Sequence, residues 1–257
     1  MNKPLLIGLS LSFLVAAACG AFAQTPAPEL TRKIAPQYPI RAMDRGLEGW
    51  VEINFQIGAD GTVSNAKVTA SMPEDTFDKA ALAAVSKWQY APAETGRPLP
   101  RTEVIAFSML TTGTIRSEVV DQLNMASKAI QDGRAGDAEK IMKKVADADQ
   151  LTLTELMFLE RVRGLADYKA GRFSEASRHF NRMLEVFATR MAPEAVVGVV
   201  QMLAMAQVSA GAFPEAIAAV DRWLPPDRSL EPSVSAMLGR IRQALTDGRP
   251  IRLAPTP

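Results

Sequence analysis

The sequence predicts an α+β protein in which a small domain with an antiparallel sheet precedes an all-α domain of helical repeats. Between residues 51 and 69, hydrophobic residues alternate with polar ones, which is the period of a strand with one buried face. From Ser117 to Asp247 they recur at three- and four-residue spacing, which is typical of helices. The polar sequence Thr111-Thr112-Gly113-Thr114 separates the two patterns, so we expect the repeats to form a folding unit of their own.

Two predicted strands form a β-hairpin near the start of the small domain. From Val51 to Ile57 every second residue is hydrophobic, with polar residues between, so one face of this strand should be buried and the other polar. Asp60-Gly61 tolerates positive φ. The chain should therefore reverse there and return antiparallel from Val63 to Thr69.

A helix and a last strand complete the small domain. Pro73 and Glu74 should open the helix, and Pro92 follows its end because proline has no amide hydrogen to donate. The buried face of this helix should carry Phe77, Ala80, Ala81, Ala84, Val85 and Trp88. Gly96, Pro98 and Pro100 predict a loop before a strand from Glu103 to Leu110. This strand follows a helix rather than a turn, so we expect it at an edge of the sheet, where an extended peptide can add to its free N–H and C=O groups.

The order of these elements resembles the C-terminal domain of TonB-family energy transducers. The resemblance rests on YPxxA from Tyr38 to Ala42, Gly46 and Gly49 before the first strand, the Asp60-Gly61 turn, and Trp88 with Pro92. It implies a non-catalytic domain that binds a short extended segment of an outer-membrane receptor, linked to transport across that membrane. The matching positions implied for peptide binding are Gln37, Tyr38, Pro39, Val104, Ile105, Ala106 and Phe107. Periodicity alone favours ordinary packing roles for the same residues.

Two departures from the family pattern bear on energy coupling. Family members that transmit force carry a membrane helix with a histidine that meets an inner-membrane proton-driven motor complex, followed by a long proline-rich spacer. Here the apolar run near the amino terminus has no histidine, and only a short segment separates Gln24 from Pro36. The alternative hypothesis is therefore a non-energised cell-envelope adaptor whose helical repeats bind a partner protein.

The amino terminus predicts export to the periplasm or cell envelope of a Gram-negative bacterium. Lys3 precedes an uncharged run that ends at Ala21-Phe22-Ala23, the form of a signal peptide cleaved after Ala23. The run is also long enough to remain as a membrane anchor, and Cys19 after three alanines is a poor version of a lipid-attachment site. The predicted organisation is a signal peptide or anchor over 1–23, a linker over 24–35, the TonB C-terminal-like domain over 36–112, repeats over 116–247 and a tail over 248–257.

Three related stretches mark the repeats. Each places a glycine five residues before an alanine: Gly133 and Ala138, Gly171 and Ala176, Gly211 and Ala216. The glycine should end the first helix of a pair in the left-handed conformation, and the alanine should let the second helix pack closely. The sequence predicts helix pairs over 117–147, 152–187 and 193–224 and a closing helix over 232–247, similar to degenerate tetratricopeptide repeats. Thr152 and Glu155 predict a capping box, and a repeat array exposes a concave surface that can bind a protein partner.

Composition argues against catalysis and nucleic-acid binding. The chain has one histidine, His179, and one cysteine, which excludes His-rich metal sites and ordinary zinc clusters. His179 lacks a nucleophile elbow or partner acid in the sequence, so a half-packed or solvated helical histidine is the favoured interpretation. Lys and Arg number 29 against 28 Asp and Glu, and no basic stripe indicates nucleic acid. No catalytic residue, cofactor or metal is predicted. Met183, Met191, Met202 and Met205 could form an adaptable groove, but at helical spacing methionines are more often core residues.

Overall fold

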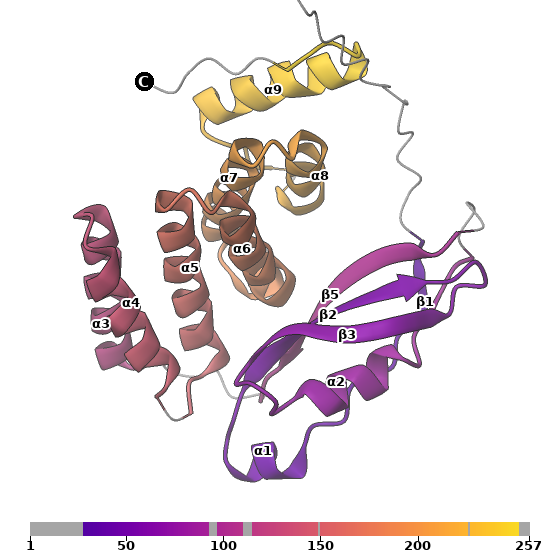
Figure 1. Ribbon diagram of the computed structural model, residues 1–257, viewed down its shortest axis with the longest axis vertical. Helices are drawn as coiled ribbons and strands as arrows, with labels where there is room; N and C mark the ends of the chain where they lie inside the picture. Colours follow the sequence, from indigo (N-terminus) through magenta and orange to yellow (C-terminus); the bar gives the residue numbers. More distant parts are fainter. Residues whose placement is uncertain (1–27, 93–96, 110–114, 149, 226, 252–257) are drawn as a thin grey trace, which may run out of the picture.

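The computed structural model describes residues 28–92, 97–109, 115–148, 150–225 and 227–251. It has the predicted fold class, with a small α+β part followed by a helical part (Figure 1). The predicted leader, anchor and lipid-attachment residues lie outside the described ranges. Within those ranges, no helix combines the length and the apolar character needed to cross a bilayer.

The small part contains five strands and two helices among the described residues. They are β1 (Leu30–Arg32), α1 (Ile40–Asp44), β2 (Gly49–Ile57), β3 (Val63–Met72), α2 (Asp78–Val85), β4 (Gln89–Tyr90) and β5 (Leu99–Phe107). Strands β3, β2 and β5 form an antiparallel sheet in that order, and β1 pairs with β4. The predicted hairpin is confirmed, with Gly61 at φ 79° in its turn. The prediction that the last strand lies at a sheet edge is also confirmed.

Several predicted boundaries in the small part were wrong. The helix begins at Asp78 rather than at Pro73 and Glu74, because Asp75 has a left-handed φ of 58° that interrupts a helix. It ends at Val85, so Trp88 lies beyond it, and Gln89 belongs to β4. The last strand begins at Leu99 instead of Glu103 and ends at Phe107 instead of Leu110.

Two segments interpreted as irregular are in fact extended. Pro100 was assigned to a loop but lies in β5, where an edge strand tolerates proline because one side of its backbone needs no partner. Leu30–Arg32, in the predicted linker, forms β1 and pairs with β4. The β1–β4 pairing holds the segment before Tyr38 next to the residues that follow α2.

The helical part follows the predicted ranges closely. Its elements are α3 (Ser117–Gln131), α4 (Ala135–Ala146), α5 (Leu153–Lys169), α6 (Phe173–Phe187), the 3-10 turn η1 (Ala188–Arg190), α7 (Pro193–Ser209), α8 (Phe213–Trp223) and α9 (Pro232–Thr246). The repeat glycines Gly133, Gly171 and Gly211 have φ values of 76°, 75° and 77°, and each paired alanine is buried. The capping box of Thr152 and Glu155 is present at the start of α5.

Three hydrophobic clusters hold the chain together. The first joins α2 to one face of the sheet and includes Trp88. The second joins the opposite face of the sheet to α3, α4, α5 and α6, with Trp50 among its buried members. The third joins α6, α7, α8 and α9, and Trp223 packs against it. Figure 1 shows α2 on one side of the sheet and α5 and α6 on the other.

The helices cover one end of the polar face predicted for the first strand, whereas Asn54 further along it stays exposed. Glu52, which alternates with hydrophobic residues in β2, is 8% exposed because the helices cover it. Its Oε2 accepts a hydrogen bond from Nε of Arg182 in α6 at 2.7 Å. Glu48 just before β2 also bridges the two parts, since its carboxylate accepts from the backbone N–H of Leu153 at 2.8 Å and of Met109 at 2.6 Å. The sheet and the helices thus share a packed, polar-bridged interface.

Candidate functional site

Residues 34–40, here called the Tyr-Pro segment, run beside α2 and are fixed at two points. Nε1 of Trp88 donates to the backbone oxygen of Ile34 at 2.8 Å. The hydroxyl of Tyr38 donates to the backbone oxygen of Leu47. The Tyr38 ring makes edge contacts with Phe77 and Phe107, at centroid distances of 5.5 and 5.8 Å. Burial of the hydroxyl, and then the charge of Glu48, raise the pKa of Tyr38, so it stays a neutral hydrogen-bond donor at physiological pH.

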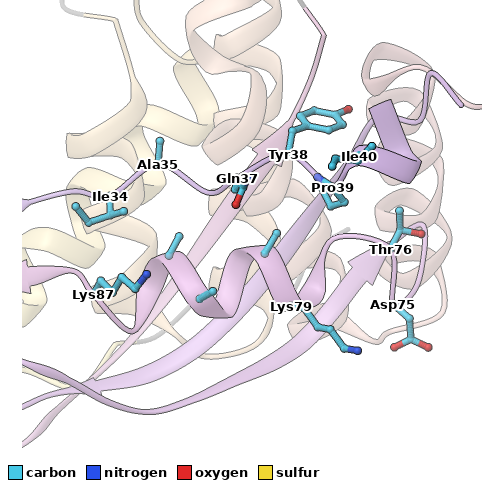
Figure 2. A pocket seen from close by; sticks show the side chains of 13 residues that line it. Ile34, Ala35, Gln37, Tyr38, Pro39, Ile40, Asp75, Thr76, Lys79 and Lys87 are labelled. Atoms are coloured by element: carbon cyan, nitrogen blue, oxygen red, sulfur yellow. The ribbon is translucent and has the colours of Figure 1, made fainter. Parts of the chain in front are cut away.

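A groove of about 550 Å³ lies between the Tyr-Pro segment and α2. Figure 2 shows the segment on one side and the α2 ribbon on the other, with Lys79 and Lys87 extending from the helix region. Ala80, Ala83 and Ala84 of α2 line it. These short side chains leave the space that longer ones would fill. We call this cavity the Tyr-Pro groove.

Exposed apolar side chains extend the surface around this groove. Ile40, which lines the groove, is 71% exposed, and Met43 on the same short helix is 54% exposed. Large hydrophobic residues at this exposure are typical of interaction surfaces when they gather at a concave site. The lysine ammonium groups at the rim can donate hydrogen bonds to carboxylates or backbone carbonyls. The groove therefore combines exposed apolar surface with hydrogen-bond donors at its rim.

Strand β5 offers its backbone edge but not its side chains. Ile105 and Phe107 are buried in the cluster beneath α2. Val104 and Ala106 point to the opposite face and pack against the helices. No strand within the described residues pairs with the outer edge of β5. Main-chain groups along this edge are thus the means by which β5 could hold an extended segment.

The structure brings together only some of the predicted site residues. Gln37, Tyr38 and Pro39 line the Tyr-Pro groove, and Tyr38 reaches the end of β5 through its contact with Phe107. Val104 and Ala106 lie on the other face of the sheet. Sequence reasoning missed Lys79 and Lys87 as groove residues. The sequence did carry a signal: Lys79 and Lys87 flank Ala80, Ala83 and Ala84, and a helix face with such short side chains indicates a shallow surface.

A second polar centre lies at the interface between the sheet and the helices. We call Arg182, Glu52, Glu160 and His179 the Arg182 network. The Arg182 guanidinium bonds to Glu52 and, through Nη1, to Oε2 of Glu160 at 3.2 Å, and its Cζ lies 4.7 Å from the centre of the Trp50 ring. Nδ1 of His179 lies 2.7 Å from the same Glu160 oxygen. Charge pairing satisfies these buried groups, so the arrangement is that of a structural network.

The Glu160 carboxyl is kept ionised by its neighbours. Burial alone would raise its pKa, but the hydrogen bond with His179 and the charges of His179, Arg182 and Arg163 outweigh burial and lower the pKa of Glu160 to about 2. Within the described ranges, no group of three or more His, Cys, Asp and Glu side chains is arranged to hold a metal ion.

Comparisons with known proteins agree with the geometry of the small part. The family model for the C-terminal domain of the Gram-negative bacterial TonB protein matches residues 34–109. Protein TonB of Escherichia coli strain K12 is 32% identical over 69 residues, 27% of this chain and 29% of that protein. Protein tonB2 of Pseudomonas aeruginosa is 40% identical over 62 residues, 24% of this chain and 23% of that protein.

A solution NMR structure of the Pseudomonas aeruginosa TonB C-terminal domain covers 35% of this chain and 95% of its own, at 28% identity and a TM-score of 0.31. The alignments span less than a third of the length of the first curated relatives. The resemblance read from the sequence is thus confirmed for residues 34–109, and α3 to α9 lie outside the match.

Proposed function

Because residues 34–109 match the TonB C-terminal family, we propose that they bind an extended segment of an outer-membrane receptor in the periplasm, in support of transport through that receptor. The observation that carries this proposal is the Tyr-Pro groove, which is preformed, rimmed by two lysines and adjoined by exposed Ile40. The role is one of binding, since the groove presents hydrogen-bond donors and apolar surface without a nucleophile and base in contact.

The proposed binding mode combines two surfaces. The segment adds to the outer edge of β5 through main-chain hydrogen bonds, which give affinity with little dependence on side chains. Side chains of the segment enter the Tyr-Pro groove, where Lys79 and Lys87 select for carboxylates or carbonyls. Tyr38 links the two surfaces because it lines the groove and contacts Phe107 of β5.

The test uses synthetic peptides copied from periplasm-facing segments of outer-membrane receptors of the same bacterium. Calorimetry should show binding that Lys79→Glu with Lys87→Glu weakens by about tenfold, since reversing rim charges replaces attraction by repulsion. Lys67→Glu is the matched control, because Lys67 is exposed on β3 and does not line the groove. Equal effects of the two changes would contradict a role for the groove.

Strand addition is tested separately with proline. Val104→Pro, Ile105→Pro and Ala106→Pro each remove one N–H, and variants that keep the wild-type melting temperature are retained. Loss of one main-chain hydrogen bond should weaken binding by about two- to tenfold. Backbone amide shifts on peptide addition should map to β5 and the Tyr-Pro segment. Shifts confined to α5 and α6 would move the binding function to the helical part and support the adaptor hypothesis.

An energy-coupled role would further require an inner-membrane proton-driven motor as partner. Only a chain that keeps an anchor could transmit force from such a motor, so the mass of the protein isolated from the envelope decides between the two roles. Loss of residues 1–23 would favour the non-energised adaptor, and retention of Met1 with the apolar run would favour coupling.

A further inference from the structure

The helical part contains a second groove, far from the Tyr-Pro groove in sequence and lined almost wholly by apolar side chains. Its walls are α5 and α7, the first helices of the second and third pairs, and it encloses about 330 Å³. Met157, Met183, Met191 and Met202 line it together with Phe158. We call it the Met groove. Methionine side chains are flexible and polarizable, so they suit surfaces that adapt to a partner's apolar side chains.

The four methionines interpreted from the sequence as core residues pack in or against the third hydrophobic cluster, as that interpretation expects, and three of them also line this groove. Met183 is buried, but Met191 and Met202 are only half-buried and face this groove. Met205, the fourth methionine of that set, does not line it and packs in the third cluster. Met191, just before α7, and Met202, within α7, therefore share this open surface.

Gly198 gives the Met groove a flat wall. It lies in the interior of α7, where glycine weakens a helix relative to alanine. A Cβ at this position would meet no atom within 4 Å, so no close packing inside the described chain requires a glycine there. The absent side chain leaves room in the groove that an apolar side chain of a ligand can occupy.

Arg161 supplies the groove with one charge. Among the described arginines of the helical part, the guanidinium groups of Arg161 and Arg240 make neither an ion pair nor a side-chain hydrogen bond, whereas those of neighbours such as Arg163 and Arg172 are paired. Arg161 is exposed and lines the groove, whereas Arg240 does not. An unpaired guanidinium beside an apolar surface is complementary to a ligand that carries a carboxylate next to hydrophobic groups.

We propose that the Met groove binds an amphipathic helix of a partner protein, with large apolar side chains among the methionines and one Asp or Glu side chain paired with Arg161. A helix satisfies its own backbone hydrogen bonds, whereas an extended segment buried here would leave backbone groups unpaired, since the walls are helices with their own bonds made. Arg161 is the one polar side chain that the described residues contribute to the lining. A chain terminus is usually held by several donors, so the carboxylate belongs to a side chain.

The experiment selects ligands for the full-chain protein from a displayed library of helical peptides, and the winners are resynthesised with both ends blocked. The selected peptides should share two large apolar residues three or four positions apart and an Asp or Glu within the next turn. Fluorescence anisotropy should show that Gly198→Leu weakens their binding at least about tenfold. Arg161→Gln should weaken it by about fivefold, as should changing the peptide acid to its amide, and the two changes together should cost no more than either alone.

The chain offers a matched control for each substitution. Gly239 also lies exposed inside a helix, and a Cβ there would meet no atom within 4 Å. Gly239→Leu and Arg240→Gln should leave peptide binding unchanged. Both leucine variants should raise the melting temperature, because leucine is the better helix former, so loss of binding in Gly198→Leu does not reflect unfolding.

Four results would overturn the proposal. Peptides that bind Gly198→Leu as tightly as the wild type place the ligand elsewhere. If the selected peptides carry no Asp or Glu, or if Arg161→Gln does not weaken their binding, the proposed ion pair with Arg161 does not form. If peptides bind only when their C-terminal carboxylate is free, Arg161 pairs with a chain terminus and not with a side chain. Self-association of the wild type that Gly198→Leu abolishes in sedimentation assigns the groove to a second copy of this chain. None of these results affects the role proposed for residues 34–109.

Discussion

Replacing Arg182 with methionine tests whether the sheet and the helices are held together by the buried charges between them. Arg182 is 9% exposed and holds Glu52 at 2.7 Å and Glu160 at 3.2 Å. Removing one member of a buried ion pair typically costs about 3–5 kcal/mol, because it leaves an uncompensated charge. Here Glu52 keeps a hydrogen bond from Thr69 at 2.7 Å, and Glu160 keeps its contact with His179. We therefore expect the lower end, about 3 kcal/mol.

Urea unfolding at pH 7 and thermal unfolding measure this effect. A loss of about 3 kcal/mol should lower the melting temperature by roughly 6–12 °C for a protein of this size. Arg178→Met is the matched control on the same helix, since the Arg178 pair with Glu175 is exposed and should contribute less than about 1 kcal/mol. A double-mutant cycle with Glu52→Gln should show a coupling of about 1–3 kcal/mol.

Two outcomes would refute this reasoning. If Arg182→Met costs no more than Arg178→Met, the buried charges do not stabilise the interface. If the cycle with Glu52→Gln shows no coupling, the cost comes from the contacts of Arg182 with Glu160 and Trp50 and not from the pair with Glu52. In either case the shared hydrophobic cluster would be the main attachment between the two parts.

The remaining predictions concern the helices. Because the folded-state pKa of Glu160 is lowered from 4.5 to about 2, its contribution is fully present above pH 4.5 and is lost as the pH falls toward 2. Urea unfolding of the wild type should lose about 2 kcal/mol through this group between pH 5 and pH 2.5, and Glu160→Gln should not show this loss. Equal slopes for the two proteins would contradict it. Gly164→Ala should cost about 1–3 kcal/mol, since a Cβ would lie 2.6 Å from the Phe180 ring, and Phe180→Leu in the same chain should restore part of the melting temperature. Thr152→Ala should cost about 1 kcal/mol of unfolding free energy through loss of the capping box. An unchanged denaturant midpoint would show that Glu155 caps α5 without the Thr152 hydroxyl.

The helical part was predictable because its signals are local. A glycine with left-handed φ ends the first helix of each pair, and its position in the sequence fixes the turn. The boundaries of α2 were less predictable, because the left-handed conformation of Asp75 has no distinct sequence signature beyond a tolerance shared with many aspartates. Pro100 was misassigned for a related reason, since proline is compatible with both a loop and an edge strand.

The contacts that build the interface and the grooves could not be predicted from local patterns. Glu52 and Arg182 lie 130 residues apart, and alternation alone indicates that Glu52 faces solvent. The Tyr-Pro groove depends in the same way on where α2 lies beside residues 34–40. Sequence periodicity tells which face of an element is apolar, but it does not tell which distant element covers the other face.

The distribution of tryptophan among the three hydrophobic clusters gives the protein three built-in optical probes. The chain has three tryptophans, with Trp88 in the cluster under the sheet, Trp50 between sheet and helices, and Trp223 against the last helices. Variants that keep one indole and replace the other two by phenylalanine would emit from one region at a time. The Trp50 signal then follows separation of the two parts, while the Trp88 signal follows melting of the small sheet, so the order of these events can be read from fluorescence alone.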